Sequence, residues 1–179
     1  MAAEAEVLWR ARLAGAEATE ALGELLGAAL EAGTLLALDG ELGTGKTTLV
    51  RGLARGLGVR DAVSSPTFTR MRALEGRLPL YHFDAWRAGG EELFAEGADF
   101  LAGDGVAVVE WAERVEGLLP HPRVALRLGH LAPGRRSVEA LRPVAPPGAP
   151  GQRAAALEER LRAVLERARA LPGLEAGPA

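Results

Sequence analysis

Apolar and polar residues change their spacing near residue 40, and this change predicts a strand followed by a helix. Residues 34–39 read TLLALD, a short apolar run of the length of a buried strand. From Lys46 onward, apolar residues recur on one face of a helix: Leu49, Val50, Leu53 and Leu57. The loop between the two segments therefore connects the end of a strand to the first turn of a helix.

The same two spacings predict the other elements. Helical spacing indicates helices over residues 17–32 and 154–170, with a short helix inside 89–100. Strand patterns occur at residues 68–74, 78–83, 106–110, 124–128 and 137–141, and a short edge strand is expected at 7–9. Turns at residues 75–77 and 133–134 join two pairs of these strands into antiparallel hairpins. We therefore expect an α/β fold with a mostly parallel central sheet, antiparallel additions and flanking helices.

The loop at the first strand–helix junction carries a phosphate-binding pattern. Gly40, Gly45, Lys46 and Thr47 fit G-x-x-x-x-G-K-[ST], in the strand-and-helix context that gives the pattern meaning. Glycines allow backbone angles closed to other residues, so successive N–H groups can converge on an anion at the helix N-terminus. Lys46 adds a charge for the outer phosphates, and the Thr47 hydroxyl suits Mg²⁺. The residues expected to contact the nucleotide are Glu41, Leu42, Gly43, Thr44, Gly45, Lys46, Thr47 and Thr48.

The use of lysine sharpens this prediction. Of the 21 basic residues, Lys46 is the only lysine, and every other one is arginine. A lysine presents a compact ammonium charge, whereas an arginine presents a wide, planar guanidinium group. A single lysine in this loop therefore indicates a site that needs the compact charge. The alternative is a glycine-rich turn that matches the pattern by chance, since the chain has 23 glycines.

Composition sets the class of the protein. The 179 residues suit one globular domain. The chain has no cysteine, which excludes disulfides and thiolate metal sites. Its net charge of −3 does not favour strong direct binding of tRNA. No apolar run is long enough to span a membrane, and we expect a cytoplasmic protein. The expected organisation is an ATPase domain over 1–142, a Pro/Gly-rich connection over 143–153, an amphipathic helix over 154–170 packed on the same domain, and a disordered tail over 171–179.

Four residues outside the loop are candidates for the site, each with a structural alternative. Thr67 lies in a hydroxyl-rich segment around a proline, which is either a turn or a nucleotide switch. Asp84 and Glu110 each end an apolar strand and could bind Mg²⁺ or orient water, although Asp84 could equally cap the next element. Trp111 could cover the base or ribose of a nucleotide, or it could pack in the hydrophobic core. The three histidines show no zinc-ligand spacing.

Taken together and in order, GELGTGKTT, SPTFT, YHFDAWR and VVEW resemble the TsaE (YjeE) family of bacterial P-loop ATPases over roughly residues 16–141. The resemblance implies an ATP- and Mg²⁺-dependent ATPase that acts with the TsaB and TsaD proteins. It implies a role in placing the threonylcarbamoyl group on the adenosine beside the tRNA anticodon. Ala85 and Trp86 depart from the Leu-Tyr usual in the family, and Ala112 stands where Pro is common.

The resemblance also implies a role for each matching residue. Lys46 would hold the outer phosphates and take part in catalysis, while Thr47, Asp84 and Glu110 would hold the metal. Asp84 and Glu110 would also serve catalysis, and Thr67 and Trp111 would contact the nucleotide.

Composition and pattern weigh against the competing functions. A small-molecule kinase would use the same phosphate cradle, but residues 88–105, the only stretch long enough for a lid, contain no basic residue. A GTPase would need an N-K-x-D motif, and the chain has no asparagine. The presence of Lys46, Thr47, Asp84 and Glu110 argues against an adaptor protein without catalytic activity. Because no arginine is convincingly placed as a finger, we expect slow hydrolysis by the isolated chain.

Overall fold

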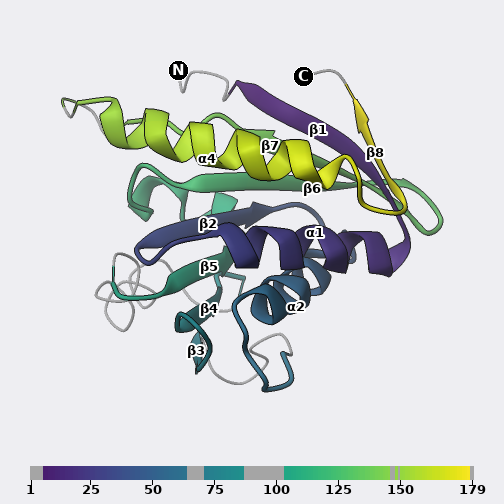
Figure 1. Cartoon of the computed structure of the whole chain (residues 1–179), viewed down its shortest axis with the longest axis horizontal. Coiled ribbons are helices and arrows are strands. Elements are labelled where there is room, and N and C mark those ends of the chain that lie inside the picture. Colours follow the sequence, from purple (N-terminus) through teal and green to yellow (C-terminus); the bar gives the residue numbers. More distant parts are fainter. Residues whose placement is uncertain (1–5, 64–70, 87–102, 146–147, 149, 178–179) are drawn as a thin grey trace.

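The computed structural model describes residues 6–63, 71–86, 103–145, 148 and 150–177. Their strands form one eight-stranded sheet in the order β3-β4-β5-β2-β6-β7-β1-β8 (Figure 1). The strands are β1 (Val7–Ala14), β2 (Thr34–Asp39), β3 (Met71–Leu74), β4 (Leu80–Asp84), β5 (Val106–Glu110), β6 (Val124–Ala132), β7 (Arg135–Leu141) and β8 (Leu174–Gly177). The helices are α1 (Gly15–Ala29), α2 (Lys46–Gly56) and α4 (Gln152–Ala168), with short 3₁₀ helices η1 (Ala112–Arg114) and η2 (Glu116–Leu118).

The middle of the sheet is parallel and its two sides are antiparallel. β4, β5, β2 and β6 run parallel to one another, whereas β3 joins β4, and β7, β1 and β8 join β6, through antiparallel pairing. The predicted α/β class and both predicted hairpins are therefore confirmed. A parallel centre matters for function because the carboxyl ends of its strands meet at one edge, where ligands bind in such sheets.

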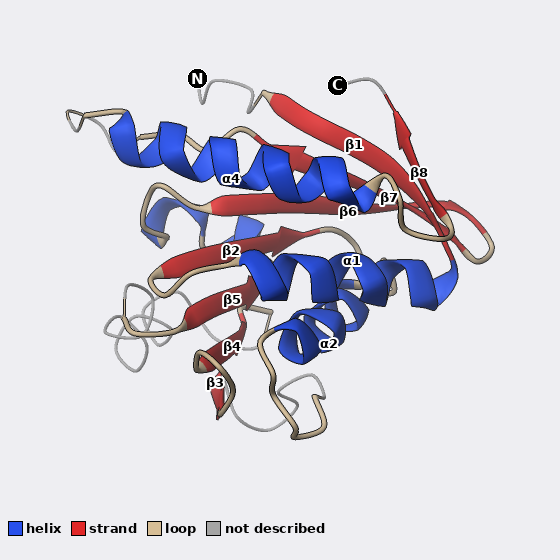
Figure 2. Ribbon diagram, in the orientation of Figure 1, coloured by secondary structure: helices blue, strands red, loops and turns tan. Residues whose placement is uncertain are grey.

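Helices α1, α2 and α4 cover one face of the sheet (Figures 1 and 2). Because side chains alternate along a strand, residues such as Leu36 and Val108 face these helices and join them in the larger core. Their neighbours Ala37 and Val109 face the other way and pack in a smaller core with Ala112, Val115 and Leu119, from η1 and the turns around it. The two faces of the sheet are thus covered unequally.

Helix α2, which begins in the phosphate-binding loop, lies unusually close to α1. A Cβ atom added at Gly52 would stand 2.0 Å from the Glu20 carbonyl oxygen, and one added at Gly23 would stand 2.2 Å from that of Leu49. Only glycine permits this approach, because real Cβ atoms do not come so near a backbone oxygen. The glycines therefore allow α2 to pack closely against α1. This packing fixes the position of the helix that carries Lys46 and Thr47.

The C-terminal part differs from the prediction. The expected disordered tail contains β8, which pairs antiparallel with β1, and Leu174 is buried in the larger core. β1 consequently lies between β7 and β8 rather than at the edge. The predicted final helix is present as α4, and it buries its apolar side in the same core. The division into a domain, a connection and a helix stays a prediction. Within the described residues, no helix has the length and apolarity that crossing a bilayer needs.

Candidate nucleotide-binding site

A pocket of about 460 Å³ opens at the carboxyl edge of the parallel strands. It is lined by Leu42, Gly43, Gly45, Lys46, Thr47, Thr48, Asp84, Trp86, Glu110 and Trp111. The fold therefore brings most of the predicted site residues into one cavity, although they come from three separate parts of the sequence. Thr67 and the short helix expected inside residues 89–100 lie outside the described residues.

The loop between β2 and α2 has the backbone that its glycines predict. Gly45 is the N-cap of α2 with φ 103°, in the left-handed region that disfavours a side chain. At Gly40, an added Cβ would stand 2.2 Å from the Leu128 carbonyl oxygen. Thr44 is buried and its hydroxyl donates to the Glu41 carbonyl at 2.8 Å. Glu41 and Thr44, predicted to contact the nucleotide, do not line the pocket and instead close the turn of the loop.

The hairpin of β6 and β7 holds this loop from outside. His130 Nε2 lies 3.0 Å from the Leu42 carbonyl oxygen, and Arg136 Nε donates to the Gly43 carbonyl at 3.1 Å. These contacts tie up two outward carbonyl groups of the loop. No feature of the sequence marks either residue as part of the site, because the contacts join segments about 90 residues apart, 88 in one case and 93 in the other.

Lys46 is buried beneath the loop with its ammonium group fully engaged. Nζ donates to the Gly40 and Glu41 carbonyl groups and lies 3.7 Å from the centre of the Trp111 ring. Burial lowers the pKa of Lys46, while the carboxylates of Glu110 and other nearby acids act in the opposite direction. The amine is thus held at the wall of the cavity, against the backbone of the loop.

Trp111 adopts a strained backbone that places its ring over the lysine. It has φ 61°, the only positive φ of a non-glycine residue in the described part of the chain. The ring centre lies 4.7 Å from that of Trp86, and the Arg114 guanidinium stands over Trp86 at 4.4 Å. Such strain persists only where the surroundings enforce it, and it concentrates at functional sites. Trp111 therefore lines the pocket beside the ammonium group of Lys46.

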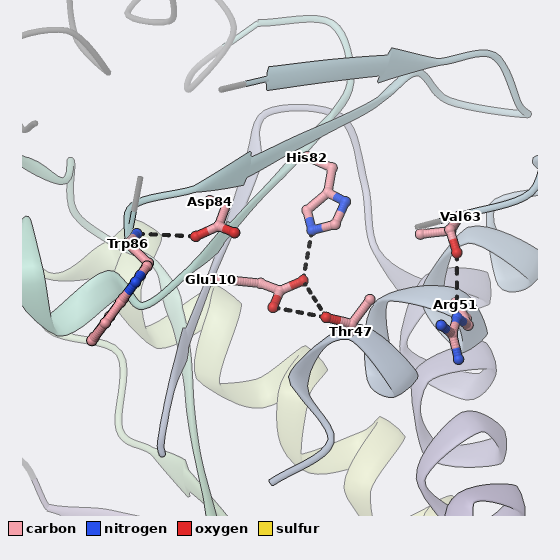
Figure 3. A network of polar contacts seen from close by, with 7 residues as sticks. All are labelled: Thr47, Arg51, Val63, His82, Asp84, Trp86 and Glu110. Carbon is pink, nitrogen blue, oxygen red and sulfur yellow. Dashed lines mark hydrogen bonds and ion pairs between the residues drawn. The ribbon is translucent and has the colours of Figure 1, made fainter. Parts of the chain in front are cut away.

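The two predicted acids stand side by side. Asp84 and Glu110 are paired in the register of β4 and β5, and both are buried. The Thr47 hydroxyl lies 3.0 Å from one oxygen of Glu110 and 3.1 Å from the other (Figure 3). Asp84 accepts a hydrogen bond from the Trp86 backbone N–H at 3.0 Å, so it also caps the following turn, as its structural alternative predicted. Hydroxyl and carboxylate oxygens are the ligands that Mg²⁺ prefers.

Comparison with known proteins agrees with this geometry. Residues 13–138 match the family model described as "Threonylcarbamoyl adenosine biosynthesis protein TsaE". This chain belongs to the TsaE family. The match covers nearly the same residues, 16–141, over which the motifs resemble that family.

Curated relatives and a solved structure show how far the TsaE likeness extends. The tRNA threonylcarbamoyladenosine biosynthesis protein TsaE of Treponema pallidum is 44% identical over 125 residues, which are 69% of this chain and 93% of that protein. The TsaE protein of Bacillus subtilis is 38% identical over 128 residues, 71% of this chain and 81% of the relative. The crystal structure of Bacillus subtilis YdiB has a TM-score of 0.70 and 33% identity, covering 90% of this chain and 99% of that one. The family and the P-loop NTPase fold are thereby confirmed.

One buried residue beside Glu110, His82, is not predicted from the sequence to take part in the site of this TsaE family member. His82 has no exposed surface, and its Nε2 atom lies 2.8 Å from Oε1 of Glu110 (Figure 3). The spacing of the histidines along the sequence predicts no zinc site and gives His82 no other role. A signal did exist, because His82 and Asp84 are two residues apart on one strand and must therefore face the same side of the sheet.

Proposed function

We propose that the chain is a Mg²⁺-dependent ATPase that acts with TsaB and TsaD in tRNA threonylcarbamoyladenosine modification. The observation that carries the proposal is the placement of Lys46 at the phosphate loop, beside a hydroxyl and two buried carboxylates from neighbouring strands. P-loop enzymes use this set of groups to hold a nucleotide and its metal. Membership of the TsaE family supplies the biological setting.

Each side chain has a role that follows from its place. Lys46 would neutralise charge on the outer phosphates, and the amides of Gly43 and Gly45 would bind phosphate oxygens. Thr47, Asp84 and Glu110 would hold Mg²⁺, and their oxygen donors fit that ion. When bound, the ion offsets charge that develops on the phosphate oxygens. Thr67 is proposed as a further nucleotide contact, on the strength of the motif match.

We propose slow turnover by the isolated chain. Lys46 is the only basic side chain of the described residues that lines the pocket, and Arg114 stacks on Trp86 instead. An arginine finger accelerates phosphoryl transfer by roughly 10³- to 10⁵-fold in enzymes that receive one from a partner. Arg70 and Arg87, which with Arg114 are the candidates for such a finger in the sequence, lie outside the described residues. A partner protein is therefore the expected source of activation.

The first experiment measures ATP turnover by the purified chain, alone and with TsaB and TsaD, adding tRNA separately. Stimulation by the two proteins supports the proposal. Rapid turnover by the chain alone contradicts the need for partners, and phosphate transferred to a small acceptor shows a kinase instead. Stimulation only by tRNA would contradict the expected absence of strong direct tRNA binding.

The second experiment tests the cradle itself with Lys46→Ala. Loss of a charge-assisted contact worth about 1.5 to 3 kcal/mol weakens ATP binding by roughly 10- to 150-fold. Titration calorimetry measures that affinity. Arg55→Ala is the matched control, since Arg55 lies on the same helix but forms surface ion pairs with Glu20 and Glu24. Equal affinities for the two variants would show that the loop does not bind the triphosphate.

A further inference from the structure

The buried histidine beside Glu110 is the feature that the proposed function does not use. His82 lies on β4 between Leu80 and Asp84 on the same side of the sheet, and it pairs with Val108 of β5. Leu80 and Val108 are fully buried in the larger core. An apolar side chain at position 82 would suit these neighbours, because burying an imidazole removes two polar nitrogens from water.

The histidine has one hydrogen bond, and it goes to the acid of the site. A carboxylate can only accept, so the His82 Nε2–H donates to Oε1 of Glu110 at 2.8 Å. Nδ1 of the same ring is buried and has no hydrogen-bond partner among the described residues. All the polar stabilisation that His82 receives there comes through Glu110. The ring is therefore placed to serve that carboxylate.

Glu110 is consequently held from two elements at once. His82 donates from β4, while the Thr47 hydroxyl reaches the carboxylate from the first turn of α2 (Figure 3). Two donors on separate elements restrict the rotation of a glutamate side chain that would otherwise turn about three bonds. A partner of this kind around a metal or catalytic site typically changes activity or metal affinity by about 10- to 100-fold when it is removed.

We propose that His82 is a positioning residue that fixes the orientation of the Glu110 carboxylate for phosphoryl chemistry at the loop. The inference rests on the proposed ATPase function and adds a residue to it. His82 does not line the pocket, and its hydrogen bond goes to Glu110, so it would act through that carboxylate. Its loss should therefore change turnover and metal binding more than nucleotide binding.

The test compares His82→Leu, His82→Gln and Tyr81→Phe. Leucine fills the core without a donor, and glutamine restores an N–H donor. Tyr81 is the matched control, because it lies next to His82 on β4, faces the other side of the sheet and donates to Asp104 at 2.8 Å. For each variant, calorimetry measures ADP affinity with the metal chelated, electron paramagnetic resonance measures Mn²⁺ affinity in the ADP complex, and steady-state assays measure turnover at saturating ATP.

We expect His82→Leu to lower turnover by about 10- to 100-fold and to weaken Mn²⁺ binding in the same direction. ADP affinity should stay within about threefold, the pattern of an interaction that matters after binding. His82→Gln should recover part of the loss, and Tyr81→Phe should change none of the three quantities. A thermal unfolding midpoint of His82→Leu at or above that of the unmodified protein would show that the loss is not a folding defect.

Two results overturn the inference. If His82→Leu matches Tyr81→Phe in turnover and Mn²⁺ affinity, the histidine does not position Glu110. If His82→Gln is as impaired as His82→Leu, the donor is not what matters. Both results leave the proposed function intact as long as the unmodified protein binds ADP and hydrolyses ATP. Failure of the unmodified protein to bind ADP would instead remove the proposed function, and this inference with it.

Discussion

Two acids at the same edge of the sheet differ in the surroundings that the fold gives their carboxyl groups. Glu110 ends β5 and Asp39 ends the neighbouring strand β2, where Leu38 is paired with Glu110. Side chains alternate along a strand, so the one-residue offset turns the two acids to opposite faces. Glu110 faces α2 and the pocket, whereas Asp39 lies in a second cavity of about 370 Å³ on the other face.

Their partners differ more than their positions do. Glu110 receives hydrogen bonds from His82 and Thr47 and contributes to the field around Lys46. Asp39 accepts a hydrogen bond from the Glu113 backbone N–H at 2.9 Å, and its carboxyl group also interacts with the Glu113 side chain. Burial, followed by the interaction with Glu113, raises the pKa of Asp39 to about 6. Both acids contribute to the field around Lys46, Glu110 more strongly than Asp39. What separates them is their donors, because Glu110 receives hydrogen bonds from two side chains whereas Asp39 receives one from a backbone N–H and lies against another acid.

The largest effect that tests this comparison is expected from Glu110→Gln. Glutamine keeps the size of the side chain but loses the charge and the ability to take a proton, which is worth roughly 10²- to 10⁴-fold in turnover for a general base. Steady-state turnover with TsaB and TsaD measures the change. Glu113→Gln, which removes the acid beside Asp39 and a weaker contributor than Glu110 to the field around Lys46, is the control and should change turnover far less. A small effect of Glu110→Gln would mean that the two acids do not differ in role.

A smaller effect is expected from Thr47→Val, which keeps the shape of the side chain and removes the hydroxyl beside Glu110. Losing one hydrogen bond to a charged group costs about 1.5 kcal/mol, or roughly tenfold in affinity. The loss should appear in ADP affinity measured with Mg²⁺ and vanish when the metal is chelated. Thr19→Val removes another buried helical hydroxyl, one that bonds the Gly15 carbonyl, and serves as control. An equal loss with and without Mg²⁺ would contradict the assignment of Thr47 to the metal.

The smallest effect on turnover is expected from Asp39→Asn, whose consequence should be pH-dependent stability. The pKa of Asp39 rises on folding from 3.8 to about 6, so between these pH values the folded protein holds a proton that the unfolded chain releases. This contribution to the free energy of unfolding is complete below pH 3.8 and is lost as the pH rises through 6. Asparagine removes it.

Urea unfolding of both proteins between pH 4 and 7 measures this difference. The variant should gain stability relative to the unmodified protein as the pH rises across that window. A constant difference in the free energy of unfolding would show that the carboxyl group of Asp39 is not perturbed by folding, and that its environment resembles that of an exposed acid.

Much of the site was predictable because its signals are local. The glycine pattern and the lone lysine identify the loop from contiguous residues, and an apolar run that ends in an acid identifies Asp84 and Glu110 one strand at a time. Periodicity likewise predicts β5 over the very residues that form it, Val106–Glu110. These features depend on backbone preferences and side-chain alternation within one segment, so they can be predicted from that segment alone.

Contacts between distant segments were beyond such reasoning. The order of the strands pairs Asp84 with Glu110 and places His82 against the same carboxylate, and no local pattern specifies which strands become neighbours. The same holds for His130 and Arg136 of the hairpin, which bond to the loop. It also holds for β8, which lies in the segment expected to be disordered and forms by pairing with β1. Local sequence patterns identified the side chains that could act on a phosphate. Their mutual distances arose from burial and strand pairing across the whole chain, because those forces act between residues that are remote in sequence.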